Sequence, residues 1–380
     1  MIIAVLLLAC ISSIIYGFFI IDIWAKARTY MAITPPFDYS PSLHISVIIP
    51  VKNEEKTIAK TIESILLNSF PSNQLEIIVI NDHSDDRTLS ILENIHGAPL
   101  TIINLEDHID KNKKYNSYKK EALKVALNLA NGELIMQTDG DCRVSSNWLQ
   151  QTAYNFEERG VKFQTGRIAF LGGDSFLEQF QRFDMNVMME LTKVGIITGR
   201  WYLANGANMA YLRSELPQEL YKESKKIASG DDVFLVNEMA QRVQMLSEIH
   251  FEENVLIETE PMYTFQSFIQ QRIRWAGKNK ILMKNAMSNV LVIPALYNGF
   301  LIFLLLLGII NPYVWLILFC SLMIKASIDC LLIFIFKSHA SLPPIWTYIT
   351  SSLLFPFYMV GIGMYSFVAK SYKWKGRNVS

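Results

Sequence analysis

Hydrophobic and polar residues are distributed differently at the two ends of this chain and in its middle. Apolar runs with few charged residues lie at about residues 2–21, 291–310, 313–336 and 345–369. Each run is long enough for a helix to cross the roughly 30 Å hydrocarbon core of a bilayer. The pattern predicts one N-terminal and about three C-terminal membrane helices, with a globular region between them.

Charged residues near these runs suggest how the chain is oriented. Lys26 and Arg28 follow the first run, and the positive-inside rule places that side in the cytoplasm. A cleaved signal peptide fits less well, because no basic residue precedes the run and no small-residue cleavage site follows it. The C-terminal end is in conflict, since three further crossings would leave the basic tail outside. A re-entrant or interfacial segment would resolve this, and Pro356 makes the last run the weakest span.

Two charges interrupt the second C-terminal run. Lys325 and Asp329 are four residues apart and therefore lie on one face of a helix. Unpaired charges in a membrane are costly, so we expect the two side chains to pair with each other or to face a neighbouring helix.

The middle of the chain alternates strand and helix patterns. Residues 45–50 and 75–80 are apolar and rich in β-branched side chains, as in buried parallel strands, and residues 57–69 between them have helical spacing. A third short apolar run occupies residues 134–136. This alternation predicts an α/β fold with a mostly parallel, Rossmann-like sheet.

Acidic and amide side chains follow each of these three strands. The strings are NEE at residues 53–55, NDHSDD at 81–86 and DGD at 139–141. Carboxyl ends of parallel strands share one edge of a sheet, so we expect the three loops to converge there. Converging carboxylates repel one another unless a cation or hydrogen-bond donors lie among them. Asp139 and Asp141 therefore form a candidate site for Mg²⁺ or Mn²⁺, which prefer carboxylate oxygens, rather than a solvated turn.

Further motifs follow in a fixed order. After SVIIPVKNEEKTIAKTIESIL, IIVINDHSDDRT and ANGELIMQTDGD come NGANM at residues 205–209, GDDVFL at 230–235 and QRIRW at 271–275. In this combination, residues 44–286 resemble the membrane-bound family 2 glycosyltransferases, which have the GT-A fold and DXD and QxxRW motifs. The resemblance implies a nucleotide-diphosphate sugar donor, a divalent cation and inversion at the anomeric carbon.

The resemblance also implies roles for individual residues. Asp139 and Asp141 hold the metal on the diphosphate of the donor, and Asp232 is the general base that takes the proton of the acceptor hydroxyl. Further donor-binding residues are Pro50, Val51, Asn53, Glu54, Asp82 and Lys119, with uracil the most plausible base. The acceptor and diphosphate region is lined by Asp231, Gln271, Arg274 and Trp275.

Simpler roles stay open for some of these residues. Lys119 also suits a solvated helix position, and the sequence departs from the family at Tyr118 and Lys124, where glycine and asparagine are frequent. Asp231 and Asp232 also suit a helix N-terminus, where the helix dipole favours acids.

Two stretches have helical, amphipathic patterns. In residues 262–286 a basic side, formed by Arg272, Arg274, Lys278, Lys280 and Lys284, favours an interfacial helix at an anionic membrane surface. An anchor without site contacts is the alternative to the acceptor role. Residues 174–198 interleave phenylalanine and methionine with polar residues, which predicts core packing more strongly than a lipid-facing acceptor entrance.

Composition adds limits on partners and domains. The 35 basic and 35 acidic residues balance, so no nucleic acid partner is expected. The four cysteines have no metal-ligand or disulfide spacing. We expect an N-terminal transmembrane helix (1–25), a linker (26–43), a catalytic domain (44–261), an amphipathic interfacial helix (262–286), C-terminal transmembrane helices (287–370) and a basic tail (371–380).

The sequence thus predicts an integral protein of the inner, cytoplasmic membrane with its catalytic domain in the cytoplasm. Its expected partners are a nucleotide sugar, a lipid or glycan acceptor and membrane lipids. The expected reaction moves a hexose or N-acetylhexosamine from a UDP-sugar to a lipid or lipid-linked acceptor. A processive synthase of a β-linked polysaccharide or chito-oligosaccharide is the alternative, and an inactive membrane scaffold is a third reading.

Overall fold

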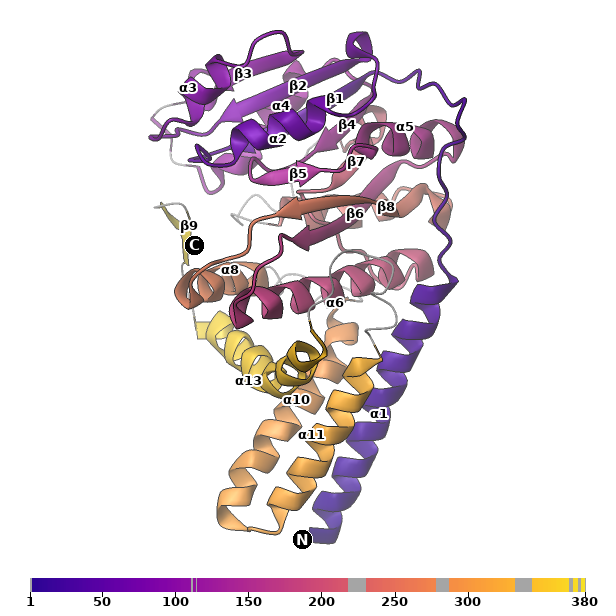
Figure 1. Ribbon diagram of the computed structural model, residues 1–380, viewed down its shortest axis with the longest axis vertical. Helices are drawn as coiled ribbons and strands as arrows, with labels where there is room; N and C mark the ends of the chain where they lie inside the picture. Colours follow the sequence, from indigo (N-terminus) through magenta and orange to yellow (C-terminus); the bar gives the residue numbers. More distant parts are fainter. Residues whose placement is uncertain are drawn as a thin grey trace. The chain divides into compact units, whose positions relative to one another are not determined.

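The computed structural model describes residues 2–110, 112–113, 115–217, 230–277, 287–331, 344–368, 372–374 and 377–379. Within it the chain forms two compact units (Figure 1). We call the first the helical unit; it comprises Met1–Met31, Gly172–Val194 and Pro261–Lys370. The second, the sheet unit, comprises Ala32–Leu171, Gly195–Glu260 and Ser371–Ser380. The domain boundaries drawn from the sequence remain predictions.

An eight-stranded mixed sheet forms the centre of the sheet unit, in the order β3-β2-β1-β4-β7-β6-β8-β5. The first four in this order are parallel: β3 (Leu100–Asn104), β2 (Leu75–Asn81), β1 (Ile45–Val51) and β4 (Leu134–Gln137). The strands β6 (Phe163–Phe170) and β8 (Ile249–Thr259) lie side by side and are parallel, and the antiparallel strands β7 (Met209–Leu212) and β5 (Cys142–Val144) flank them. The predicted α/β fold with a mostly parallel sheet is confirmed.

Helices cover this sheet and bring their N-termini to its functional edge. They are α2 (Ile58–Leu66), α3 (Thr88–Glu93), α4 (Tyr118–Leu129), α5 (Trp148–Glu158) and α7 (Asp231–Ala240), with short 3₁₀ turns at Ser72–Gln74, Leu105–Asp107, Arg213–Glu215 and Leu246–Glu248. Since α4 connects the parallel strands β3 and β4, its first turn lies at the carboxyl edge of the sheet.

One face of the sheet packs against α4 and α7 in a continuous core. Ile48, Ile135 and Tyr211 of the sheet are buried together with Ala122, Leu123 and Ala126 of α4 and with Leu235 and Val236 of α7. Positions 122, 123 and 126 share one side of α4 because they recur at helical spacing. Burial of that side fixes both helices, and with them the side chains in their first turns.

The partly buried carboxylate of Glu76 fixes the position at which β4 begins. Glu76 accepts hydrogen bonds from the backbone nitrogens of Asn131 (2.6 Å) and Gly132 (3.2 Å) and from the Ser46 hydroxyl. Although burial opposes it, this set of donors lowers the pKa of Glu76 below its ordinary value. The strand that leads into DGD therefore begins at a fixed point on β1 and β2.

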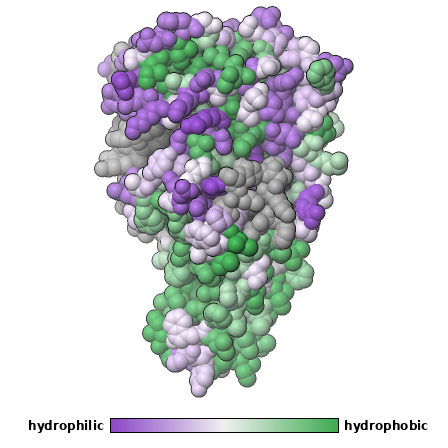
Figure 2. Space-filling model, viewed as in Figure 1, coloured by the Kyte–Doolittle hydropathy of each residue, from purple (hydrophilic) through white to green (hydrophobic). Residues whose placement is uncertain are grey.

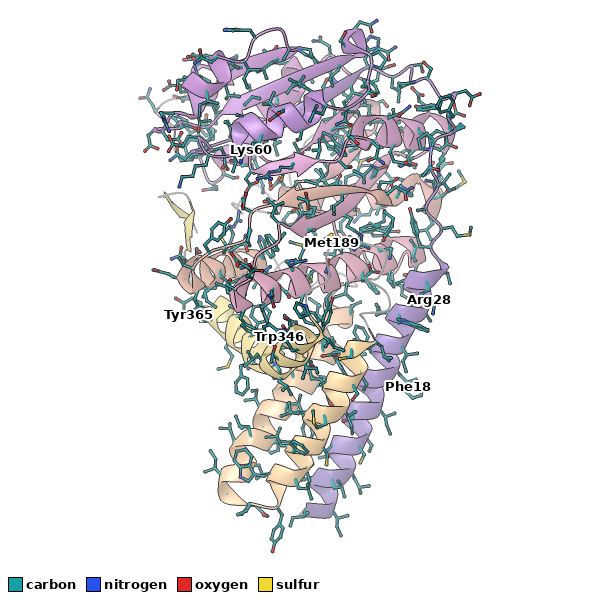
Figure 3. The ribbon with its side chains drawn as sticks, viewed as in Figure 1. Phe18, Arg28, Lys60, Met189, Trp346 and Tyr365 are labelled. Atoms are coloured by element: carbon teal, nitrogen blue, oxygen red, sulfur yellow. The ribbon has the colours of Figure 1, made fainter. Side chains whose placement is uncertain are left out.

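The helical unit contains α1 (Ile2–Thr29), most of α6 (Phe176–Thr198), α8 (Phe265–Gly277), α10 (Met287–Ile310), α11 (Val314–Cys330) and α13 (Ile345–Val368). Among the described residues, Ile2–Thr29, Val290–Ile310 and Ile345–Tyr365 are long and apolar enough to cross a membrane. On the face that Figure 2 shows, most residues on the surface of the bundle formed by α1, α10 and α11 are hydrophobic. Phe18, for example, points outward from α1 and is 70% exposed (Figure 3).

Charged and hydroxyl side chains are buried inside this bundle. Lys325 and Asp329 of α11 pair with each other, as the sequence predicts. Asp329 also accepts hydrogen bonds from Tyr16 of α1 (2.6 Å) and Ser352 of α13 (2.6 Å). These contacts join three helices through one carboxylate, which satisfies the charge away from lipid.

The axes of the long helices in the helical unit are not all aligned. In Figure 1, α10 and α11 run alongside α1, whereas α13 lies across them, and Pro356 falls within α13.

On α6, Phe180, Phe183 and Met189 are buried, and the ring centroid of Phe180 lies 6.0 and 6.4 Å from those of Phe268 and Phe355. Figure 3 labels Met189 on this helix. Core packing, the stronger prediction for residues 174–198, accounts for these side chains.

The described part of the C-terminal tail is short. Strands β9 (Tyr372–Trp374) and β10 (Arg377–Val379) pair antiparallel.

Candidate functional site

The loops after β1 and β2 are joined by hydrogen bonds. Asp82 N donates to Val51 O (2.7 Å), and Asn53 N donates to Ser84 Oγ (3.0 Å). Asn53 also exchanges side-chain and backbone hydrogen bonds with Asp85. This double loop includes four of the predicted donor-binding positions, and its polar groups are largely paired with each other.

The acidic residues of this double loop are also anchored. Glu54 N donates to Thr88 Oγ1 (2.7 Å). Asp86 accepts from the backbone and hydroxyl of Thr88 and from Glu55 N, and these donors outweigh burial and lower its pKa. Pro50 is the last residue but one of β1 and pairs with Ile80.

Asp82 and Val51 are the most buried of the predicted donor-binding residues. Asp82 is 2% exposed, and its Oδ1 is 3.0 Å from Nδ1 of His83. The His83 ring meets Tyr118 edge to face, with ring centroids 5.4 Å apart. An aromatic side chain at the start of α4 thus flanks the end of β2, where the sequence predicts donor binding.

The DGD turn packs directly against the β1 loop. A Cβ atom on Gly140 would lie 2.8 Å from Cγ1 of Val51 and 3.1 Å from Cγ of Glu54. Gly140 O accepts a hydrogen bond from Thr61 Oγ1 of α2 (3.0 Å). Glycine is therefore needed here for close approach of the chain to itself, whereas its φ is not in the left-handed region. Asp139 and Asp141 flank this contact and are half-buried.

Lys119 reaches this turn from α4. Its Nζ donates a hydrogen bond to Oδ1 of Asp139 at 2.7 Å. Burial lowers the pKa of Lys119, but Asp139, Asp231 and Asp232 outweigh it and raise the pKa above its ordinary value, so the ammonium stays charged. Its neighbour Lys120 instead lies over the Phe234 ring at 5.7 Å. The solvated-helix alternative for Lys119 is therefore wrong.

The GDD string forms the N-terminus of α7, with Gly230 before it at φ 91°. Asp231 and Asp232 lie in the first turn and are 6% and 8% exposed. Asp232 Oδ1 accepts from Val233 N (2.8 Å), and its Oδ2 from Gly206 N (3.4 Å). The predicted helix N-terminal position is confirmed; the role of Asp232 as general base stays a prediction.

The ends of the strands and the first turns of α4 and α7 thus bring Lys119 and several carboxylates together. Lys119 faces Asp139 directly and lies within the field of Asp231 and Asp232, and Asp141 is on the same turn as Asp139. Asp139 and Asp141 are carboxylates on one half-buried turn, and carboxylate oxygens are the ligands that a hard divalent cation prefers. In the described part of the chain no three His, Cys, Asp or Glu side chains group as a metal site. Two carboxylates suit Mg²⁺ or Mn²⁺ shared with substrate phosphates, which complete the coordination.

QRIRW lies on α8, in the helical unit. Arg272 is 2% exposed and pairs with Asp184 of α6 at 3.1 Å. Its guanidinium lies 4.3 Å from the centre of the Trp275 ring. The prediction that Arg272 belongs to a basic surface is wrong, because a buried carboxylate on α6 draws it inward. One face of Trp275 is therefore covered by Arg272.

The other predicted residues of this helix are less buried. Arg274 and Trp275 are partly exposed, and Gln271 Oε1 is buried without a hydrogen-bond partner among the described residues. Lys278, Lys280 and Lys284 lie outside the residues that the structure describes.

Sequence reasoning missed two polar residues beneath the site. Gln137 ends β4, two residues before Asp139, and Tyr211 lies on the neighbouring β7. Both are fully buried, and the amide of Gln137 and the hydroxyl of Tyr211 have no partner within the described ranges. A glutamine at the end of an otherwise apolar strand was the available signal for Gln137.

Comparison with known proteins gives relatives at low identity. The chain is 24% identical over 240 residues to glycosyltransferase AglE of Haloferax volcanii, covering 62% of this chain and 73% of AglE. It is 25% identical to the probable glycosyltransferase YdaM of Bacillus subtilis, over 70% of this chain and 64% of YdaM. It is 20% identical to a Methanococcus voltae dolichyl N-acetyl-α-D-glucosaminyl phosphate 3-β-D-2,3-diacetamido-2,3-dideoxy-β-D-glucuronosyltransferase, over 70% of this chain and 85% of that protein.

The fold is shared with a solved structure. The mannosyltransferase PcManGT of Pyrobaculum calidifontis, solved with GDP-Man and Mn²⁺, aligns over 97% of this chain and 98% of its own at 16% identity, with a TM-score of 0.55. Residues 46–216 match the family described as glycosyl transferase family 2, and residues 134–367 match glycosyl transferase family group 2. Because the latter match covers more than half of the chain, this protein belongs to the family 2 glycosyltransferases and is a glycosyltransferase with the GT-A fold.

Proposed function

We propose that this enzyme inverts the anomeric carbon while it moves a hexose or N-acetylhexosamine from a nucleotide-diphosphate sugar to a lipid or lipid-linked acceptor. The donor is a UDP-sugar, and transfer takes place at the cytoplasmic face of the membrane. The observation that carries the proposal is the contact of Lys119 with Asp139, within the field of Asp231 and Asp232.

Transfer makes two chemical demands on such a site. The bond between the sugar and the diphosphate breaks through an oxocarbenium-like state, so negative charge develops on the leaving group. Asp139 and Asp141 would hold Mg²⁺ or Mn²⁺, which supplies Lewis-acid stabilisation of that charge when bound. The ammonium of Lys119, kept charged by its carboxylate neighbours, adds a second positive group at the same turn.

The acceptor hydroxyl must also lose a proton. Asp232 accepts hydrogen bonds from Val233 N and Gly206 N, and these fix the carboxylate at the start of α7. A fixed carboxylate within hydrogen-bond reach of the hydroxyl, directly or through one water, can act as the general base. Attack then comes from the side opposite the departing diphosphate, and the configuration inverts.

Two findings favour a lipid acceptor and a membrane location. Three described helices are long and apolar enough to cross a bilayer, and the Methanococcus voltae relative is named for a dolichyl-linked substrate. The basic residues Lys26 and Arg28 at the end of α1 support a cytoplasmic location of the sheet unit by the positive-inside rule, and nucleotide sugars are made in that compartment.

The test is a transfer assay on the purified full chain in detergent. The protein is incubated with Mn²⁺, a total lipid extract and radiolabelled UDP-glucose, UDP-N-acetylglucosamine or GDP-mannose in turn, with Asp232→Asn as the matched inactive control. Label in the organic phase supports the proposal. A labelled aqueous polymer would indicate a processive synthase, and no transfer from any donor would indicate a scaffold; either result overturns the proposal.

A further inference from the structure

A small space beside Gly206 is surrounded by polar atoms from three elements. A Cβ atom on this glycine would lie 3.5 Å from Nε2 of Gln137, 3.7 Å from Nζ of Lys119 and 3.8 Å from Oδ2 of Asp231. These are ordinary contact distances, so the space can take one group of methyl or hydroxyl size. Strand β4, helix α4 and helix α7 each contribute one of the three atoms.

Two of these polar groups are buried without a partner. Gln137 is 0% exposed, and within the described part of the chain neither its amide nitrogen nor its amide oxygen is hydrogen-bonded. The same holds for Oδ2 of Asp231, whose residue is 6% exposed. Buried polar groups are nearly always paired, because an unpaired one loses its hydrogen bonds to water without replacement. Their common position beside Gly206 points to a ligand that supplies the missing partners.

The pattern of donors and acceptors identifies the chemistry of that ligand. Gln137 Nε2 and Lys119 Nζ donate hydrogen bonds, and Asp231 Oδ2 accepts one. A hydroxyl group both accepts and donates, so it can satisfy the three atoms at once. A deprotonated anion has no hydrogen to donate to Asp231 Oδ2, and an ammonium group has no lone pair to accept from Gln137 Nε2 and Lys119 Nζ.

The neighbouring contacts indicate which hydroxyl this is. Lys119 also binds Asp139, the carboxylate proposed to face the donor diphosphate, and Gln137 precedes Asp139 by two residues on the same strand. The sugar is bonded directly to that diphosphate. A sugar hydroxyl therefore lies within reach of the space beside Gly206, whereas Asp82, another predicted donor-binding residue, follows β2.

We propose that a hydroxyl group of the transferred sugar occupies the space beside Gly206, and that Gln137 and Asp231 determine which sugar the enzyme accepts. The inference rests on the proposed function, since it assumes a nucleotide-sugar donor. It assigns Asp231 to the donor sugar, next to the base Asp232, and gives Gln137 a specificity role.

Two variants test this inference: one fills the space, and the other removes a polar group beside it. Gly206→Ala fills the space at contact distance, and Gln137→Met removes the amide while keeping nearly the same volume. Gly172→Ala is the matched control, because no atom lies within 4 Å of its added Cβ. Affinities for UDP-glucose, UDP-N-acetylglucosamine, GDP-mannose, UDP and GDP are measured by titration calorimetry with Mn²⁺ on the full chain in detergent.

We expect both variants to lose roughly 10- to 100-fold in affinity for the sugar nucleotide that the wild type binds, as for one or two hydrogen bonds. Affinity for the matching nucleoside diphosphate should stay unchanged, and Gln137→Met should unfold at the same or a higher temperature than the wild type. Equal losses for sugar nucleotide and diphosphate, or no loss, would leave only an ordered water beside Gly206 and overturn this inference. If the wild type binds no sugar nucleotide at all, the proposed function fails first.

Discussion

The buried ion pair between Arg272 and Asp184 allows a quantitative test of how the QxxRW helix is held. The two side chains are 3.1 Å apart, so their Coulomb attraction is about 5 kcal/mol at an effective dielectric constant of about 20. Much of this offsets the desolvation of the two charges. Replacing Arg272 alone by methionine leaves Asp184 buried without an opposite charge, and this should cost about 3–5 kcal/mol. Methionine retains the apolar stem that packs against Phe268 and Trp275.

A double variant separates the charge pair from packing. Asp184→Asn removes the second charge but keeps an acceptor for the Tyr358 hydroxyl, which donates to Asp184 at 3.2 Å. Thermal unfolding in detergent, followed by tryptophan fluorescence, should show that Arg272→Met/Asp184→Asn is more stable than Arg272→Met. Additive losses in the double variant would refute the argument, because independent residues add and coupled ones do not.

The pH dependence gives a second measure of the same pair. Burial raises the pKa of Asp184 even though Arg272 and Tyr358 oppose the shift. A carboxyl group with a raised folded-state pKa contributes stability below its unfolded pKa and loses it as the pH rises through the folded value. Without Arg272 the pKa should rise further, so the deficit of Arg272→Met should shrink as the pH is lowered. A deficit that does not change between neutral and acidic pH would contradict this.

Three further predictions concern the sheet unit. Asp232→Asn should abolish transfer but keep Mn²⁺-dependent donor binding by calorimetry, and full activity would contradict the base assignment. Gly140→Ala should weaken donor binding at least tenfold, because its Cβ would meet Val51 at 2.8 Å and displace the DGD turn; the Gly172→Ala control should not. The lowered pKa of Glu76 gives stability above about pH 4 that is lost as the pH falls, so acid unfolding monitored by circular dichroism should be shallower in Glu76→Gln.

Much of the sheet could be predicted from the sequence because its signals are local. Strands β1, β2 and β4 are mostly apolar, and each ends at a polar loop that parallel packing must bring to one edge. The contact of Lys119 with Asp139 follows from the same topology, since α4 begins where β4 ends. Whether Lys119 or Lys120 faces Asp139 depends on the rotation of α4 about its own axis. The buried alanine and leucine side chains of α4 determine that rotation.

Features that depend on distant partners could not be predicted in this way. Arg272 follows the polar side of its helix in sequence, yet Asp184 on α6 and Tyr358 on α13 provide a polar site inside the protein. In the sequence, Gln137 is a single polar residue at the end of a hydrophobic strand. Its importance appears only when β4, α4 and α7 are packed together around Gly206.

The direction of α13 determines how many times the chain crosses the membrane. Helices α10 and α11 are joined by a tight turn, in which Val314 N donates to Asn311 O at 3.0 Å, and they run alongside α1. The length and composition of α13 allow it to cross a membrane, but it lies across α10 and α11 (Figure 1). With crossings by α10 and α11 alone, the hairpin brings the chain back to the side it left. An even number of crossings then separates the sheet unit from the tail, so Lys373 and Arg377 share its compartment. The positive charge of the tail is then in the compartment that the positive-inside rule requires.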